Sequence, residues 1–296
     1  MTGVENGVEN GGVGTSGSAR LAEVFATARS EGRAALIAYL PAGFPTHQTS
    51  IDALLAMVEA GVDIVEVGLP YSDPLMDGPT IQAATEMALR NGSTTALGLE
   101  VVAEVAATGA PALVMTYWNL LEHYGVEEFA RDLADAGGAG VITPDLTPEE
   151  GGPWFEAAKA HHLDRVLLVA PSSTDSRLQY VTASGSGFVY AASTMGVTGT
   201  RNAVSGSAET LVRRTRAVTE LPIAVGLGVS TPEQAAEVAA YADGVIVGSA
   251  FVRCLLDAAS PAAGVAAAAS LARELAAGVR AAGVRDAGVR DAGVRS

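Results

Sequence analysis

The sequence predicts an α/β fold, a (β/α)8 barrel of the TIM-barrel class with an extra N-terminal helix. Eight short apolar runs recur along the chain, and most are too continuous to be strands with one solvated face. Longer helix-like segments separate these runs, so strand and helix alternate over about 250 residues. An open doubly wound sheet is the alternative, less favoured because no G-x-G-x-x-G follows the first run.

Each element has its own local signal. The strands are the apolar runs, and two helices open on a capping residue, a proline and early acids, at Thr147-Pro148-Glu149-Glu150 and Ser230-Thr231-Pro232-Glu233. A further helix at 20–30 is expected to plug the N-terminal face of the barrel. The expected strands are 34–39, 64–67, 112–116, 140–142, 166–169, 187–190, 223–225 and 244–247. The expected helices between them are 48–59, 80–90, 96–107, 126–136, 148–161, 175–183, 208–219 and 231–240.

Both ends of the chain are repetitive. Residues 1–18 repeat GVEN among Gly, Ser and Thr, which predicts a disordered tail. From Gly278 the AGVR unit recurs every five residues, a period of neither helix nor strand, so 278–296 is interpreted as a low-complexity tail. The barrel, as the catalytic domain, is predicted to span 19–277.

The composition narrows the function classes. A formal net charge of −15 argues against nucleic acid and anionic membranes as partners. Backbone amides and helix N-termini could still hold a small anionic substrate. The single cysteine, Cys254, predicts a reducing, cytoplasmic compartment. We see no apolar run of the roughly 20 residues that a membrane span needs, and no signal peptide.

The stretch 63–82 carries the strongest catalytic signal. Glu66 lies inside an apolar, β-branched run, where a carboxylate is costly to bury. Asp73 and Asp77 follow in a loop rich in Pro and Gly. Carboxylates in different environments acquire different proton affinities, which predicts an acid–base site at the C-terminal ends of the strands.

Glycines at the seventh and eighth strand ends predict a phosphate site. Gly226 and Gly228 follow the seventh strand, and Gly248 with Ser249 follows the eighth. Glycines let backbone N–H groups approach phosphate oxygens at a helix N-terminus. Gly199, in the loop after the sixth strand, could join them.

The residue inventory excludes other mechanisms. Lys159, the single lysine, lies in a predicted helix and cannot reach a site at the strand ends as a Schiff base. There is no H-E-x-x-H, no Cys/His cluster and no G-x-S-x-G, so neither a metal nor a cofactor is predicted. Acid–base chemistry by carboxylates remains, with Tyr117 and Tyr190 as helpers.

The sequence resembles the tryptophan synthase alpha chain family. The resemblance rests on E-V-G-L-P-Y-S-D-P-L-M-D-G-P-T-I-Q at 66–82, and it runs in order from about residue 20 to 277. Further motifs are Y-L-P-A-G-F-P at 39–45, Y-x-N at 117–119, G-V-T-G at 196–199, G-L-G-V-S at 226–230 and V-G-S-A at 247–250.

The resemblance implies a reaction and roles. It implies cleavage of indole-3-glycerol phosphate to indole and glyceraldehyde 3-phosphate in tryptophan biosynthesis, a carbon–carbon lyase reaction. Protonated indole would be the electron sink, with Glu66 as the acid–base group and Asp77 as the second carboxylate. Tyr190 takes the family's tyrosine position. The implied pocket and phosphate residues are Tyr39, Met115, Tyr117, Ile142, Thr198, Gly199, Gly226, Gly228, Gly248 and Ser249.

The resemblance also implies a partner. It is a beta chain that contains pyridoxal phosphate, in an α2β2 heterotetramer, with Asp73 and Pro74 in the partner-facing segment. Pro41 and Leu227 depart from the family pattern and could retune the pocket wall. Two rival functions stay open, another phosphate-binding barrel enzyme of amino-acid biosynthesis and a non-catalytic activator of a beta chain.

Overall fold

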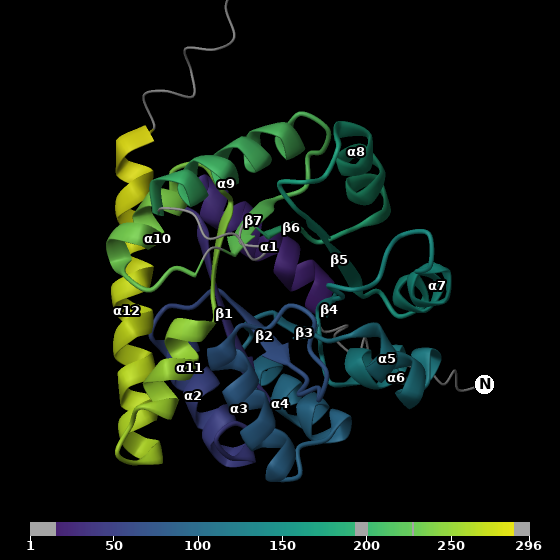
Figure 1. The fold of residues 1–296 in the computed structure, drawn as a ribbon, viewed down its shortest axis with the longest axis vertical. Helices are drawn as coiled ribbons and strands as arrows, with labels where there is room; N and C mark the ends of the chain where they lie inside the picture. Colours follow the sequence, from purple (N-terminus) through teal and green to yellow (C-terminus); the bar gives the residue numbers. More distant parts are fainter. Residues whose placement is uncertain (1–15, 193–200, 227, 287–296) are drawn as a thin grey trace, which may run out of the picture.

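The structure is a computed structural model that describes residues 16–192, 201–226 and 228–286. Eight parallel strands pair in sequence order and close into a barrel, so the predicted fold class is confirmed (Figure 1). The strands are β1 (Ala35–Pro41), β2 (Ile64–Gly68), β3 (Ala112–Met115), β4 (Gly140–Ile142), β5 (Asp164–Val169), β6 (Val189–Ala192), β7 (Ile223–Gly226) and β8 (Gly244–Val247).

Helices surround the barrel and cover its outer surface (Figure 1). Those that precede β5 are α1 (Gly17–Ser30), α2 (His47–Glu59), α3 (Pro79–Arg90), α4 (Thr95–Ala107), α5 (Trp118–Tyr124), α6 (Val126–Asp135) and α7 (Gly152–Ala160). Those that follow are α8 (Asp175–Ser184), α9 (Arg201–Arg216), α10 (Pro232–Ala239), α11 (Ser249–Leu256) and α12 (Pro261–Asp286).

Alternation along each strand divides the core into two layers. In β2, Ile64 belongs to the cluster inside the barrel, whereas Val65 and Val67 belong to the layer under the helices. Successive strand residues point to opposite faces. Glu66 therefore points into the barrel and is fully buried.

The first helix closes the N-terminal end of the barrel, as the sequence predicts. Ser16 caps α1 by accepting a hydrogen bond from the backbone N–H of Ala19 at 3.2 Å. Leu21 and Phe25 of α1 pack into the cluster inside the barrel, and the Phe25 ring lies 5.6 Å from that of Phe188. Side chains of α1 thus fill the N-terminal end of the barrel interior, which leaves the C-terminal ends of the strands as the end that can open.

The last helix corrects the predicted C-terminal boundary. The expectation that regular structure ends at Gly278 is wrong, because α12 continues to Asp286. Leu275, Ala276, Val279 and Ala282 are buried at helical spacing, and alanine has the highest helix propensity. Gly278 lets α12 approach the backbone of Pro232 at the start of α10, where a Cβ would collide.

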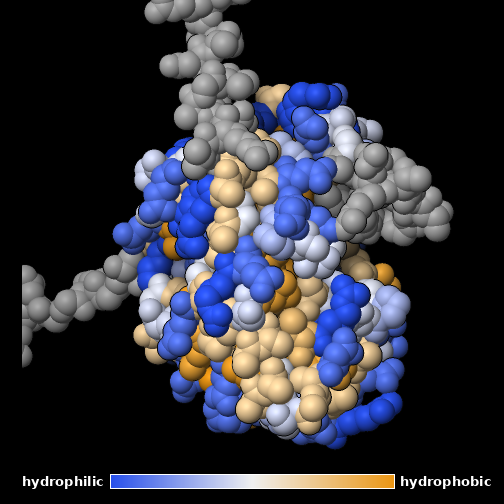
Figure 2. All heavy atoms as spheres, turned by 90° about the vertical axis from the view of Figure 1, so that its left-hand side faces the viewer, coloured by the Kyte–Doolittle hydropathy of each residue, from blue (hydrophilic) through white to orange (hydrophobic). Residues whose placement is uncertain are grey.

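The same helix bears on the membrane prediction. By length and composition alone, Pro261–Ala282 could cross a membrane, against the expectation that no run could. Its buried side packs on α10, α2 and α11. Figure 2 shows this side of the molecule as pale apolar surface interrupted by polar residues, and the exposed positions of α12 include Ala262, Ala263, Ala266 and Ala267.

Other elements also differ from prediction. The helix expected at 208–219 is α9, which begins earlier, at Arg201, and ends at Arg216. The helix expected at 148–161 begins at Gly152, because Thr147 accepts turn hydrogen bonds from the N–H groups of Glu150 and Gly151. The short helix α5, within a stretch interpreted as a loop, was not predicted.

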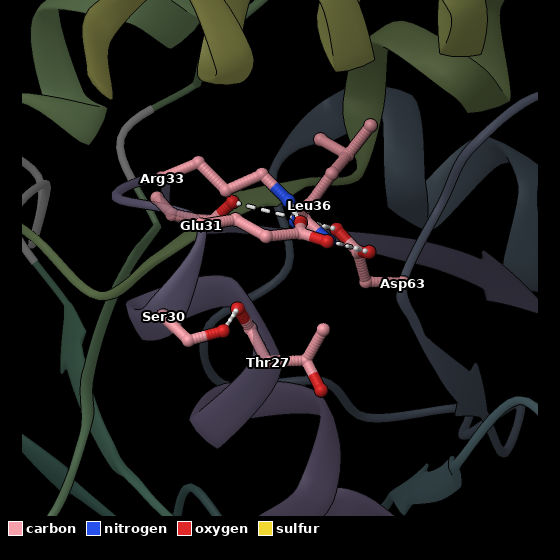
Figure 3. A network of polar contacts seen from close by, with 7 residues as sticks. Thr27, Ser30, Glu31, Arg33, Leu36 and Asp63 are labelled. Carbon is pink, nitrogen blue, oxygen red and sulfur yellow. Dashed lines mark hydrogen bonds and ion pairs between the residues drawn. The ribbon is translucent and has the colours of Figure 1, made fainter. Parts of the chain in front are cut away.

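A polar network ties the N-terminal ends of β1 and β2 together (Figure 3). The Asp63 carboxylate accepts two hydrogen bonds from the Arg33 guanidinium, at 2.8 and 3.0 Å, and one from the Leu36 N–H at 2.8 Å. The side chains of Arg33 and Asp63 are 10% and 14% exposed, so water screens this pair weakly.

We expect Asp63→Ala to destabilise the fold. It would leave the Leu36 N–H without its acceptor and the weakly exposed Arg33 charge with only the exposed Glu31 carboxylate as its partner, at a cost of roughly 3 kcal/mol. The matched control is Glu31→Ala, because Glu31 pairs with the same Arg33 but its side chain is 53% exposed. That variant should cost under about 1 kcal/mol. Urea unfolding measures both, and equal losses would contradict the assignment.

Candidate active site

One cavity of about 330 Å³ opens at the C-terminal ends of the strands. Side chains and glycines from almost every part of the barrel rim converge on it, as expected of a site in this fold. Its lining consists of Tyr39, Glu66, Met76, Asp77, Gly78, Pro79, Thr80, Ile81, Met115, Leu168, Tyr190, Ala192, Gly226, Gly228, Ile246, Gly248 and Ser249.

Glu66 is the buried acid of the cavity. Neither carboxyl oxygen has a hydrogen-bond partner among the described residues. Burial without a compensating charge disfavours the ionised form and raises the pKa of Glu66 to about 8. A carboxyl group that is still mostly protonated near neutral pH can act as a general acid.

Asp77 is the second acid, and Tyr117 holds it. Burial raises the pKa of Asp77, and a hydrogen bond from the Tyr117 hydroxyl works against that rise. The same hydroxyl accepts the Met76 N–H at 3.1 Å, which fixes the loop next to the acid. The Tyr71 ring lies 5.2 Å from the Tyr117 ring. The two carboxyl groups therefore share a cavity but have different surroundings.

Two further tyrosines face the cavity. Burial, together with the nearby carboxylates Asp77 and Glu66, raises the pKa of both Tyr39 and Tyr190, so both stay protonated and can donate hydrogen bonds. Tyr190 lies against Gly226, where a Cβ would come within 2.6 Å of the hydroxyl oxygen. Only glycine lets β7 run this close to the ring.

The opposite end of the cavity is suited to an anion. Gly248 is the N-cap of α11, and no side chain caps this helix through a hydrogen bond. Ser249 is its first residue, and Gly228 has a positive φ of 68°. Free N–H groups of a helix N-terminus and glycine turns bind phosphate in this way.

The structure brings most of the predicted residues to the cavity but not all. Ile142 is fully buried in the cluster inside the barrel and is not part of the lining. Tyr117 is not part of the lining either, and contacts it through Met76 and Asp77. Thr198, Gly199 and Leu227 lie outside the described residues. Asp73 is exposed and Pro74 half-buried on the β2–α3 loop, and neither lines the cavity.

Several residues that line the cavity were not predicted from the sequence. Leu168 and Ile246 occupy inward positions of β5 and β8, and Thr80 and Ile81 lie in the first turn of α3. Strand alternation could have revealed Leu168, since it follows Val166 by two residues. Within the described ranges, no group of three or more His, Cys, Asp or Glu could hold a metal ion.

Comparisons with known proteins agree with this geometry. The family model described as tryptophan synthase alpha chain matches residues 25–280. The alpha chain of Streptomyces avermitilis is 59% identical over 261 residues, which covers 88% of this chain and 94% of that protein.

Solved structures give the same result. A chain of Mycobacterium tuberculosis tryptophan synthase is 54% identical with a TM-score of 0.83, over 88% of this chain and 98% of that one. The tryptophan synthase alpha subunit of Legionella pneumophila is 28% identical with a TM-score of 0.80, over 88% and 98%.

Proposed function

The chain belongs to the tryptophan synthase alpha chain family, whose reaction in tryptophan biosynthesis is the cleavage of indole-3-glycerol phosphate, and we propose that Glu66 and Asp77 carry out this reaction here. The products are indole and glyceraldehyde 3-phosphate, so the chain is a carbon–carbon lyase. The observation that supports the roles best is the shared cavity, in which a buried acid, a second carboxylate and an uncapped helix N-terminus meet.

Glu66 starts the cycle protonated. We propose that it donates its proton to C3 of the indole ring, which turns the ring into a cation able to accept the electrons of the breaking bond. The carboxylate left behind then takes the proton of the glycerol hydroxyl as the aldehyde forms. Glu66 is protonated again at the end, so the two transfers balance without an outside acid.

Asp77 acts on the other end of the indole ring. In its ionised form it would stabilise the positive charge that develops on the indole nitrogen. The hydrogen bond from Tyr117 favours that form, because it lowers the pKa that burial raises. Tyr190, near both acids, would help to hold the substrate.

The phosphate would bind where β7 and β8 end. We propose that the backbone of Gly226, Gly228, Gly248 and Ser249 holds it, with Gly199 and Thr198 from the following loop. Tyr39, Met115 and Tyr117 would then lie near the indole, with Ile142 beneath them. The proposed catalytic unit is the barrel domain predicted at 19–277, together with the rest of α12, which continues to Asp286.

An alpha chain of this family has a beta chain as its partner, and we propose the finer assembly, an α2β2 heterotetramer in the cytoplasm. The proposed partner-facing segment is the β2–α3 loop with Asp73 and Pro74, whose following residues Met76, Asp77 and Gly78 line the cavity. Leu75, in the same loop, is 77% exposed, which suits a residue that a partner covers.

Release of indole from indole-3-glycerol phosphate by the purified chain tests the function. Another phosphate-binding barrel enzyme would release no indole. A non-catalytic activator would bind the beta chain and also release none. The intact pair of Glu66 and Asp77 favours the lyase over both.

Tyr117→Phe tests whether the Tyr117 hydroxyl lowers the pKa of Asp77. Without the hydroxyl, the pKa of Asp77 should rise, so the acid limb of kcat/KM moves to higher pH and the rate measured on that limb falls roughly 10-fold. The matched control is Tyr71→Phe, which removes only a hydroxyl that accepts from Asn119 at 3.4 Å. If both variants move the limb equally, Tyr117 does not act through Asp77.

A further inference from the structure

The short helix α5 begins without a cap of its own. Tyr117 is its N-cap residue and makes no side-chain capping hydrogen bond, and the first turn of the helix contains no acidic residue. The first N–H groups of a helix have no partner within the helix, and they carry partial positive charge. A cap for α5 therefore has to come from another element.

Asp145, on the loop between β4 and α7, supplies that cap. Both of its carboxylate oxygens accept the backbone N–H of Trp118, the first residue of α5, at 3.0 and 3.1 Å. The next residue of the loop, Leu146, is 6% exposed and packs in the layer under the helices, which anchors this part of the loop. The loop acid thus ties the segment after β4 to the segment after β3.

The residue at the start of α5 in turn contacts the loop between β2 and α3. The Tyr117 hydroxyl accepts the Met76 N–H at 3.1 Å, and it donates a hydrogen bond to the Asp77 carboxylate. Burial and the nearby charges of Asp77 and Asp145 raise the pKa of Tyr117, so its hydroxyl stays protonated and able to donate. The position of this hydroxyl depends on how the start of α5 is held.

We propose that Asp145 is a positioning residue of the reaction, which holds the Tyr117 hydroxyl against Asp77 by capping α5. Asp145 does not line the reaction cavity, so it can act only through another residue. This role rests on the proposed function, in which Asp77 acts on the indole nitrogen in its ionised form. Segments that follow three neighbouring strands, β2, β3 and β4, then set the position of the second acid together.

Hydrogen exchange in the folded chain tests these contacts without any substrate. The Trp118 amide should exchange faster in Asp145→Ala, roughly 5-fold, the factor that loss of a helix cap usually brings. The Met76 amide, which is bonded to Tyr117, should also exchange faster in this variant, as it should in Tyr117→Phe. A cap with only a local role would change the Trp118 amide and leave the Met76 amide as it is.

Asp145→Ala should also change the pH profile of indole release. The acid limb of kcat/KM should move to higher pH, as in Tyr117→Phe, and the rate measured on that limb should fall roughly 5-fold. Asp145→Asn should stay close to the natural chain, because asparagine caps a helix about as well as aspartate. In the Tyr117→Phe background, Asp145→Ala should have little further effect, since residues that act through one contact are not additive.

Glu149→Ala is the matched control. Glu149 is an exposed acid of the same loop, but it pairs with Arg177 of α8. Its loss should change neither the exchange of the Met76 amide nor the acid limb. Asp145 is exposed, so Asp145→Ala should fold normally, and a thermal melt checks this.

Three results would overturn the inference. They are an unchanged Met76 amide in Asp145→Ala, an acid limb that moves equally in Asp145→Asn, or effects of Asp145→Ala and Tyr117→Phe that multiply in the double variant. Failure of the natural chain to release indole would instead reject the proposed function, and the exchange rates would still report on the contacts.

Discussion

Replacing Glu66 by Gln should lower kcat for indole release by roughly 10²- to 10⁴-fold, the usual contribution of a general acid–base group. The amide has almost the same shape but can neither donate the proton to C3 nor take the hydroxyl proton. KM should change little, because both ground-state ends of the substrate keep their contacts. Steady-state indole release measures this, and Glu86→Gln on the exposed face of α3 is the matched control. Retained activity in Glu66→Gln would reject the acid–base role.

The pH dependence of the natural chain follows from the same residue. Because the reaction begins with protonated Glu66, kcat/KM should fall as pH rises through the pKa of about 8. The Gln variant should lose this basic limb along with its activity. A limb that persists in the variant would belong to another group.

Ionised Glu66 should also lower the free energy of unfolding, and this effect can be measured independently of the activity. The folded pKa of about 8 lies above the ordinary value of 4.5, so the folded state binds the proton more tightly. The penalty is absent below pH 4.5, grows as pH rises and is complete above about 8, where it is on the order of 5 kcal/mol at about 1.4 kcal/mol per pKa unit. Glu66→Gln should therefore become more stable than the natural chain as pH increases from 5 to 8.

Asp77→Asn should lower kcat by roughly 10²- to 10³-fold, the scale for losing a preorganised charge next to a developing one. The amide keeps the volume and can still bond with Tyr117, but it cannot stabilise a cation on the indole nitrogen. The protein should fold normally, because Asp77 lies on a rim loop rather than in the core. Single-turnover indole formation separates this chemical step from binding.

The outcome for Asp77 can be separated from general damage to the rim. Glu86→Gln, on the helix that follows the same loop, should match the natural chain. A drop confined to KM in Asp77→Asn would mean that the carboxylate binds substrate without acting on the developing charge.

The strands could be predicted well from the sequence, because a short continuous apolar run between two helical segments is typical of a buried strand. Where parallel strands close into a barrel, their carboxyl ends share one rim, so Glu66, Asp77 and the glycines of β7 and β8 had to meet. Depth within the barrel was not predictable, since it depends on strand register. Ile142 pairs with Met115 and Val166 and ends below the cavity floor.

Other misses have local causes. The five-residue repeat concealed the helical spacing of Val279 and Ala282, which only the partners of α12 make apparent.

The C-terminal helix has a consequence for how the barrel depends on its last element. Because α12 lies against α2 and α10, it joins the first and last quarters of the barrel across the β8–β1 seam. A truncation ahead of Pro261 would therefore leave that seam uncovered.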